Sequence, residues 1–193
     1  MHKFGKLFLI VGFVLIFGGL ALFLTVRFST AHAQTVNAAV VETIRGLLPP
    51  SQPGVTDQYS DMSMPALEID GKDYSALLEI SALGVTLPVA DVWNKWDVES
   101  QPCRFDGTVY DSTLVIGGAD RAGQFADFDL LDLGDTITVT DMTGAVFTYV
   151  IDSIDRSSSV SAEVLTDETA HLTLFVRSAF ALDYILLRCV MRK

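Results

Sequence analysis

The chain has 193 residues, carries 24 acidic and 13 basic side chains, and has a formal net charge of −11 at pH 7. This acidic balance argues against a nucleic-acid binder, which needs a basic face, and against docking on anionic lipid or anionic wall polymer without metal ions. The length leaves room for one folded domain of ordinary size behind a distinct N-terminal segment.

The N-terminus predicts a membrane anchor. Residues 1–6 contain two lysines and are expected in the cytoplasm, and residues 7–26 follow without a single charge. A helix rises about 1.5 Å per residue, so this apolar segment is long enough to cross a bilayer core of about 30 Å. Lysines before the span favour export of the rest of the chain. Ala31-His32-Ala33 also fits a signal-peptidase site, which leaves cleavage after Ala33 as the alternative.

A short helix and a linker are expected next, within an extracellular segment that covers residues 27–65. Apolar residues recur at helical spacing over residues 34–48, and Pro49-Pro50 ends that pattern. Residues 51–65 are rich in Pro, Ser, Gly and Asp, which is typical of an exposed linker. The folded domain is therefore expected to cover residues 66–193.

Short strands dominate the pattern of this domain. The two segments on either side of Met142-Thr143-Gly144 alternate with period two and predict a β-hairpin. Residues 91–98 and 125–133 are expected to form turns or short helices. Many short strands with few helices indicate an all-β barrel or sandwich. The predicted strands are 74–80, 85–89, 113–116, 136–140, 146–154, 171–176 and 184–191.

The cysteines and histidines form no recognisable metal motif. The sequence has two cysteines and three histidines, and none of them has the spacing of a zinc or calcium site. We therefore expect no metal and no cofactor. In an exported domain Cys103 and Cys189 could form one disulfide, and the alternative is two buried free thiols.

Five sequence blocks follow one another in a fixed order from about residue 65 to residue 192. They are LGVTLPV at 83–89 with Trp93 and Trp96 behind it, PCRF at 102–105 with Gly107-Thr108, VIGGADRAGQFADFDLLDLGD at 115–135, the hairpin 137–150, and LTLF at 172–175 with Arg188-Cys189 in the last strand. In this order the blocks resemble the sortases, the cysteine transpeptidases of Gram-positive cell surfaces, and in particular their small class-B-like members. The longest block is similar to the family pattern V-I-A-G-H-N-Y, then F, then L-x-x-G-D. The resemblance implies a mostly β protein, with a closed eight-stranded barrel and one or two short helices behind an N-terminal transmembrane helix.

The resemblance also implies where catalytic residues would stand. The family uses a histidine after A-G, a cysteine at the end of the penultimate strand and an arginine at the start of the last strand. These positions fall on Ala119, Arg177 and Tyr184. Alanine transfers no proton, arginine stays protonated and is no nucleophile, and tyrosine brings no positive charge to an oxyanion. We expect no catalytic residue at this site.

The substituted positions suggest a plugged or a binding pocket. Our first hypothesis is that Arg177 forms an ion pair with Asp120 or Asp183 and fills the former active site. The alternatives are that its guanidinium binds a carboxylate of a peptide ligand, or that it is an unpaired arginine on the surface. Three aromatic side chains would then line a peptide groove or pack against the domain: Trp93, Trp96 and Tyr184.

The sequence therefore predicts a membrane-anchored, extracellular pseudoenzyme with a sortase-like fold. Its expected partners are a sorting-signal peptide, a surface protein or an active sortase that it modulates. One alternative is an active transpeptidase with a relocated site, for which Cys189 and His171 are the conceivable pair because the last two strands would bring them together. The other alternative is a structural remnant without a function.

Overall fold

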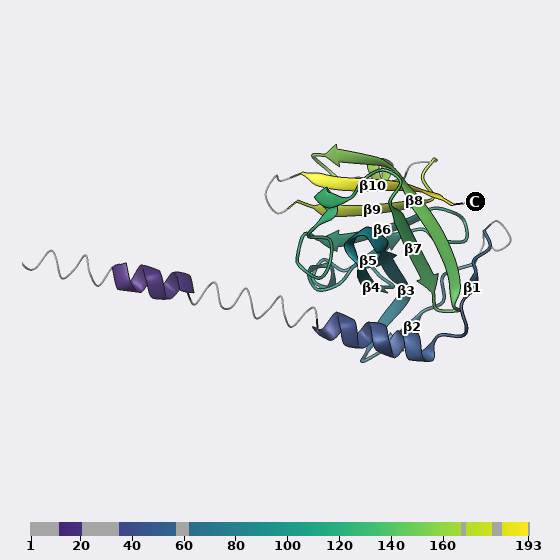
Figure 1. Ribbon diagram of the computed structural model, residues 1–193, viewed down its shortest axis with the longest axis horizontal. Helices are drawn as coiled ribbons and strands as arrows, with labels where there is room; N and C mark the ends of the chain where they lie inside the picture. The colour runs from purple at the N-terminus through teal and green to yellow at the C-terminus, as the bar shows by residue number, and fades with distance from the viewer. Residues whose placement is uncertain (1–11, 21–34, 57–61, 167–168, 179–182, 193) are drawn as a thin grey trace, which may run out of the picture.

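The computed structural model describes residues 12–20, 35–56, 62–166, 169–178 and 183–192 (Figure 1). Residues 12–20, inside the predicted anchor, form a helix with exposed large apolar side chains. Among the described residues, no helix has both the length and the apolar character needed to cross a bilayer. The remainder of the predicted anchor and the candidate cleavage site after Ala33 lie outside the described residues.

Eight strands close into a barrel. Around the barrel they follow the order β3-β4-β5-β6-β9-β10-β8-β7, and β7 pairs with β3 to close it. The pairs β4–β5 and β6–β9 are parallel, and the other six are antiparallel. The eight strands are β3 (Lys72–Ile80), β4 (Val85–Ala90), β5 (Cys103–Asp106), β6 (Leu114–Ala119), β7 (Thr136–Asp141), β8 (Ala145–Ser157), β9 (Leu172–Arg177) and β10 (Tyr184–Met191). The predicted fold class, a mostly β closed eight-stranded barrel, is confirmed.

Smaller elements connect and cover the strands. The sequence missed β5, and the expected linker 51–65 is in part structured, because β1 (Gln52–Pro53) pairs in parallel with β8 and Met64 is buried in the core. Strand β2 (Leu67–Ile69) pairs with β3. The short helices are η1 (Ser81–Leu83), η2 (Asp97–Glu99), η3 (Phe128–Leu130) and α2 (Ala162–Leu165).

The core fills the inside of the barrel. Along β7 and the first half of β8 the side chains alternate between buried and partly exposed, as expected for strands with one face inside a barrel. In contrast, Leu172 to Val176 of β9 are all buried. Leu172, Leu174 and Val176 belong to the inner core, whereas Phe175 packs with Val115 and Leu186 in a second cluster on the outside of the barrel. Other elements therefore cover the outer face of β9.

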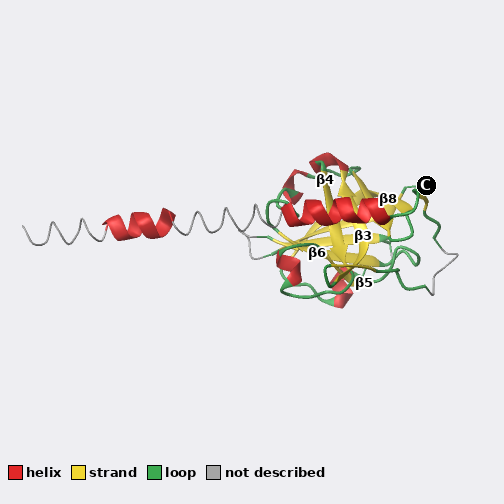
Figure 2. Ribbon diagram, turned by 90° about the horizontal axis from the view of Figure 1, so that it is seen from below, coloured by secondary structure: helices red, strands yellow, loops and turns green. Residues whose placement is uncertain are grey.

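The helix of residues 35–47 packs against the barrel rather than standing apart from it. Figure 2 shows this helix lying across β3. Val40, Val41 and Ile44 form one buried cluster with Tyr74 and Leu77 of β3. The helix thus shares a hydrophobic core with the domain that was expected to begin at residue 66.

The contact between this helix and the barrel can be tested with two substitutions on the same helix. Ile44 is 0 % exposed and Leu47 is 61 % exposed. We expect Ile44→Ala to lower the free energy of unfolding by about 3 kcal/mol, because it leaves a cavity under the helix. The control Leu47→Ala should change it by less than about 0.5 kcal/mol. Urea unfolding followed by tryptophan fluorescence measures both, and equal effects would contradict the packing described here.

Candidate functional site

The ends of three strands bring together the three positions that the sequence singled out. In the parallel pair β6–β9 the last matched residues are Ala119 and Arg177. In the antiparallel pair β9–β10 the same Arg177 lies opposite Tyr184. Ala119, Arg177 and Tyr184 are therefore neighbours across three adjacent strands, at one end of the barrel. The sequence predicted these three as one site, and the structure places them side by side.

Strand alternation puts the three side chains on the outer face of the barrel. Side chains two apart on a strand share a face, and so do directly paired residues. Phe175 belongs to the outer cluster, so Arg177, two residues further along β9, also faces outward. Its partners Ala119 and Tyr184 face the same way. The site is accordingly a surface feature and is separated from the barrel core by the sheet itself.

An aromatic floor lies next to these positions on the same face. The rings of Trp93, Phe105 and Phe175 contact one another, with centroids 5.3 Å (Trp93–Phe105), 5.5 Å (Trp93–Phe175) and 5.6 Å (Phe105–Phe175) apart. The floor depends on Gly117, because a Cβ at this position would collide with the rings of Trp93 and Phe175. The chain thus has a glycine where two large rings approach the backbone of β6.

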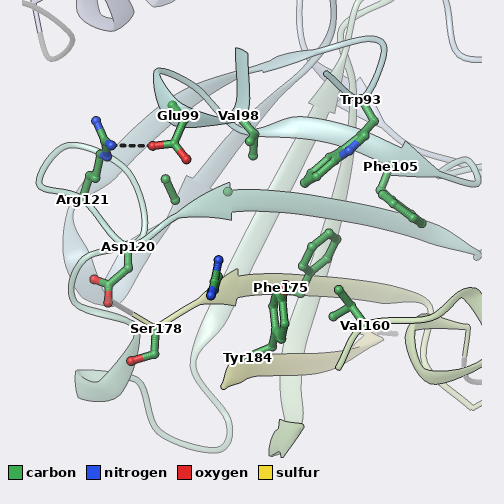
Figure 3. A pocket seen from close by; sticks show the side chains of 13 residues that line it. Trp93, Val98, Glu99, Phe105, Asp120, Arg121, Val160, Phe175, Ser178 and Tyr184 are labelled. Atoms are coloured by element: carbon green, nitrogen blue, oxygen red, sulfur yellow. Dashed lines mark ion pairs between the residues drawn. The ribbon is translucent and has the colours of Figure 1, made fainter. Parts of the chain in front are cut away.

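The floor and the strand ends enclose a pocket of about 490 Å³. Figure 3 shows its two sides: Trp93, Phe105 and Phe175 lie together with Val160, and polar side chains lie on the opposite side. There Arg121 forms an ion pair with Glu99, and both side chains are about half exposed. A pocket of this size with an apolar floor and a few polar groups is typical of a ligand site.

Arg177 does not plug the pocket. Its side chain is exposed, and no carboxylate among the described residues forms an ion pair or hydrogen bond with it. Asp183 pairs with Arg156 instead, with 3.4 Å between Oδ2 and Nη1. Asp120 lines the pocket without an ion pair to Arg177. The expected Arg177–Asp120 or Arg177–Asp183 pair is therefore corrected, and Arg156 of β8 pairs with one of the two candidate carboxylates in place of Arg177.

Only part of the expected aromatic groove is present. Trp93 and Tyr184 line the pocket, but Trp96 does not. Trp96 is 74 % exposed, and the Nζ atom of Lys95 lies 4.9 Å from its ring centroid. Sequence reasoning missed Phe105 and Phe175. Counting back two residues from Arg177 along its strand would have indicated Phe175, whereas Phe105 lies on the strand that the sequence did not predict.

The two cysteines are free and buried. Cys103 in β5 lies opposite Gly117 and therefore faces outward, whereas Cys189 in β10 belongs to the inner core. Strands β6 and β9 separate them, and three strand spacings of about 4.8 Å exceed the roughly 7 Å between Cα atoms that a disulfide tolerates. Of the two alternatives, the structure has the free thiols. Burial raises the pKa of Cys103 from 9.0 to about 11 and that of Cys189 to about 12.

A relocated Cys189–His171 pair has no geometric support. The two residues are close, since the backbone N–H of His171 donates to the carbonyl oxygen of Cys189. However, Nδ1 of His171 accepts a hydrogen bond from the backbone N–H of Met191 at 2.8 Å, and the hydrogen bond found for the Cys189 thiol is to the carbonyl of Leu187. Burial keeps this thiol protonated at neutral pH through its raised pKa. His171 is also six residues, or about 20 Å, along the chain from Arg177.

The described side chains that line the pocket include polar, charged and aromatic groups. Its described lining residues include no cysteine and no histidine. Ser178 and Tyr184 contribute hydroxyl groups, and Arg177 contributes a cation. Within the described parts of the chain, no three His, Cys, Asp or Glu side chains gather closely enough to hold a metal ion. The arrangement can bind an apolar group and an anion side by side.

The fold is that of the sortases. Sortase C1 from Streptococcus agalactiae matches with a TM-score of 0.57 and 20% identity, over 66% of this chain and 72% of that one. A sortase D5 transpeptidase from Clostridium perfringens matches with a TM-score of 0.54 and 22% identity, over 63% and 80%. Sortase C from Clostridium perfringens, solved with the C-terminal cell wall sorting motif, matches with a TM-score of 0.53 and 14% identity, over 68% and 74%.

Comparison of the sequence alone does not identify a family for this chain. No protein-family model matches the chain, and no curated protein is significantly similar to it in sequence. The three structures named above are of sortases C and D, so the resemblance to class B stays a prediction from the sequence. At these identities the similarity establishes the sortase fold and leaves the activity to be argued from the site.

The state of the two thiols provides a direct test. We expect the intact mass of the unreduced protein to correspond to two thiols, and Ellman's reagent at pH 8 to react with neither in the folded chain. A pKa near 11 lowers the thiolate fraction of Cys103 about 100-fold relative to a pKa of 9, and burial slows access further. In guanidinium chloride both thiols should react. A mass lower by two hydrogens, or fast reaction of Cys189 in the folded chain, would contradict this description.

Proposed function

We propose that this chain is a membrane-anchored pseudoenzyme with a sortase fold, which binds an extended peptide in the pocket and does not transfer it. One observation supports this proposal most strongly. Ala119, Arg177 and Tyr184 are neighbours at the ends of β6, β9 and β10, beside the aromatic floor of an open pocket. By resemblance to the sortases, these are the positions of the histidine, cysteine and arginine.

The open pocket favours binding over a remnant without function. A scaffold with no ligand has no need to keep three aromatic rings around an unfilled volume of about 490 Å³. A glycine at 117 is required only because Trp93 and Phe175 approach the strand there. Trp93 and Phe105 remain accessible above the buried Phe175, and accessible aromatic side chains at a concave site are typical of peptide recognition.

The chemistry of the pocket favours binding over transfer. Acyl transfer through a thioester needs a thiolate, a group that shuttles a proton and a donor for the oxyanion. The described lining residues supply neither the thiolate nor a histidine, and both cysteines of the chain are buried outside the pocket. An active sortase-type enzyme with a relocated site is therefore the weaker alternative.

The candidate partner is a sorting-signal peptide or a surface protein that carries one. Sortase C from Clostridium perfringens was solved with the C-terminal cell wall sorting motif, so this fold accommodates such a peptide in a relative. A chain that binds the same signals without cleaving them would compete with, or present clients to, an active sortase. Both modes use the pocket described above.

Binding without turnover is the first expected result. The full-length chain in detergent micelles would be mixed with fluorogenic sorting-motif peptides, with and without triglycine, and binding and cleavage would be recorded in the same wells. We expect saturable binding and no product. Trp93→Ala should weaken binding at least about 10-fold, because it removes part of the aromatic floor. The matched control Trp96→Ala should leave binding unchanged, because Trp96 lies outside the pocket.

Two results would contradict the proposal. Turnover that His171→Ala or Cys189→Ala abolishes would establish a relocated catalytic pair. Equal loss of binding in Trp93→Ala and Trp96→Ala would place the peptide elsewhere on the surface.

We further propose that residues 7–26 anchor the chain in the membrane with the domain outside the cell. The support is the uninterrupted apolar segment behind two lysines. In membranes of a Gram-positive host, the full-length chain should resist carbonate extraction, and protease added to protoplasts should digest the domain. Lys3→Glu and Lys6→Glu together should weaken this orientation. Extraction by carbonate or a domain protected from protease would contradict the proposal, and a mature N-terminus at Gln34 would favour the cleaved alternative.

A further inference from the structure

We infer that the pocket selects a peptide C-terminus, with the free α-carboxylate bound by Arg177 and an apolar last side chain placed on the aromatic floor. This inference rests on the proposed peptide binding and specifies its ligand. The inference depends on the position of Arg177. This residue has no ionic partner among the described residues, and it lies two positions along β9 from Phe175, one of the three rings of the aromatic floor.

The charge of the ligand follows from the surroundings of Arg177. The chain has a net charge of −11, and five arginines form ion pairs with carboxylates: Arg45, Arg104, Arg121, Arg156 and Arg188. Arg192, which lies outside the pocket, forms none with a described residue. Arg177 forms none with a described residue, although its side chain lines the pocket. A guanidinium offers a fork of N–H donors that matches a carboxylate. The ligand group that completes this site is therefore a carboxylate.

The spacing indicates that one residue supplies both the carboxylate and the apolar group. Phe175 and Arg177 face the same way and are about 6.6 Å apart along β9 at 3.3 Å per residue. This distance is close to the reach from an α-carboxylate to the tip of a leucine or phenylalanine side chain on the same Cα. An internal Asp or Glu would need a second residue to reach the floor.

Neighbouring side chains leave room for this ligand. Ala119, directly opposite Arg177 on β6, presents only a methyl group. Tyr184, directly opposite on β10, also lines the pocket, and its hydroxyl is a hydrogen-bond donor. Asp120 and the Glu99–Arg121 pair are also at the pocket, so its four charged side chains sum to zero. The preference for an anion therefore depends on short-range contact with Arg177 and not on long-range attraction.

The test uses the two tryptophans as internal reporters. Peptides of the form acetyl-Gly-Ser-Ser-Gly-X, with X Leu or Phe, would be titrated into the full-length chain in detergent micelles and followed by the indole N–H signals in NMR. Each would be compared as the free acid, as the C-terminal amide, and as an amide with an internal Asp in place of the second Ser. We expect the free acids to bind about 10-fold more tightly than the amides, shifting the Trp93 signal and not that of Trp96.

Substitutions at Arg177 test whether this residue causes the preference for the free acid over the amide. In Arg177→Gln the free acid and the amide should bind equally, and Arg177→Lys should restore part of the preference, because it returns the charge without the fork. Arg192→Gln, which removes the same charge outside the pocket, should keep the full preference.

Each contrary outcome identifies what has failed. Equal binding of acid and amide to the unaltered chain would overturn the C-terminal selection and leave peptide binding intact. A preference shown equally by the amide with the internal Asp would overturn the C-terminal claim in favour of an acidic side chain. No shift of the Trp93 signal with any peptide, together with no binding of sorting-motif peptides, would overturn the proposed function itself.

Discussion

The site depends on the parallel register between β6 and β9. Because Leu114 lies opposite Leu172, Ala119 at the end of β6 lies opposite Arg177 at the end of β9. A slip by one residue would turn Phe175 and Arg177 into the barrel and place Leu174 and Val176 outside. Burial of β9 on both faces makes such a slip costly, since an arginine would enter the apolar core.

The same strand links the stability of the barrel with the shape of the pocket. Its inner side chains fill the core, and its outer side chain Phe175 forms the floor with Trp93 and Phe105. Gly117 and Ala119 on β6 are small, so they make room for the rings and for a ligand. The proposed binding surface does not depend on residues 119, 177 and 184, because neither the core nor the floor involves their side chains. The fold and the function are separable here for that reason.

The reactive thiols are buried away from the pocket, and the accessible charges lie at its rim. Cys103 and Cys189 lie on opposite faces of the sheet, and burial keeps both thiols neutral near physiological pH through their raised pKa values. The charges that ligands can reach lie at the rim of the pocket, where Arg121 and Glu99 neutralise each other. Arg177 is the rim cation that forms no ion pair within the described chain. The pocket therefore presents an apolar floor beside one cation that forms no ion pair with a described residue.

The sequence alone determined a mostly β domain, because period-two patterns and the Met142-Thr143-Gly144 turn are local signals, and the ordered family-like blocks implied that the strands close into a barrel. The resemblance to the sortases implied that Ala119, Arg177 and Tyr184 belong to one site, and the strand pairing places the three side by side. Tertiary structure decided what no local pattern carries. It docked the helix 35–47 on β3, placed Phe105 on the floor and Trp96 outside it, and paired Asp183 with Arg156 rather than Arg177. These outcomes depend on which distant side chains compete for the same neighbour, and such competition is settled only when the chain is folded.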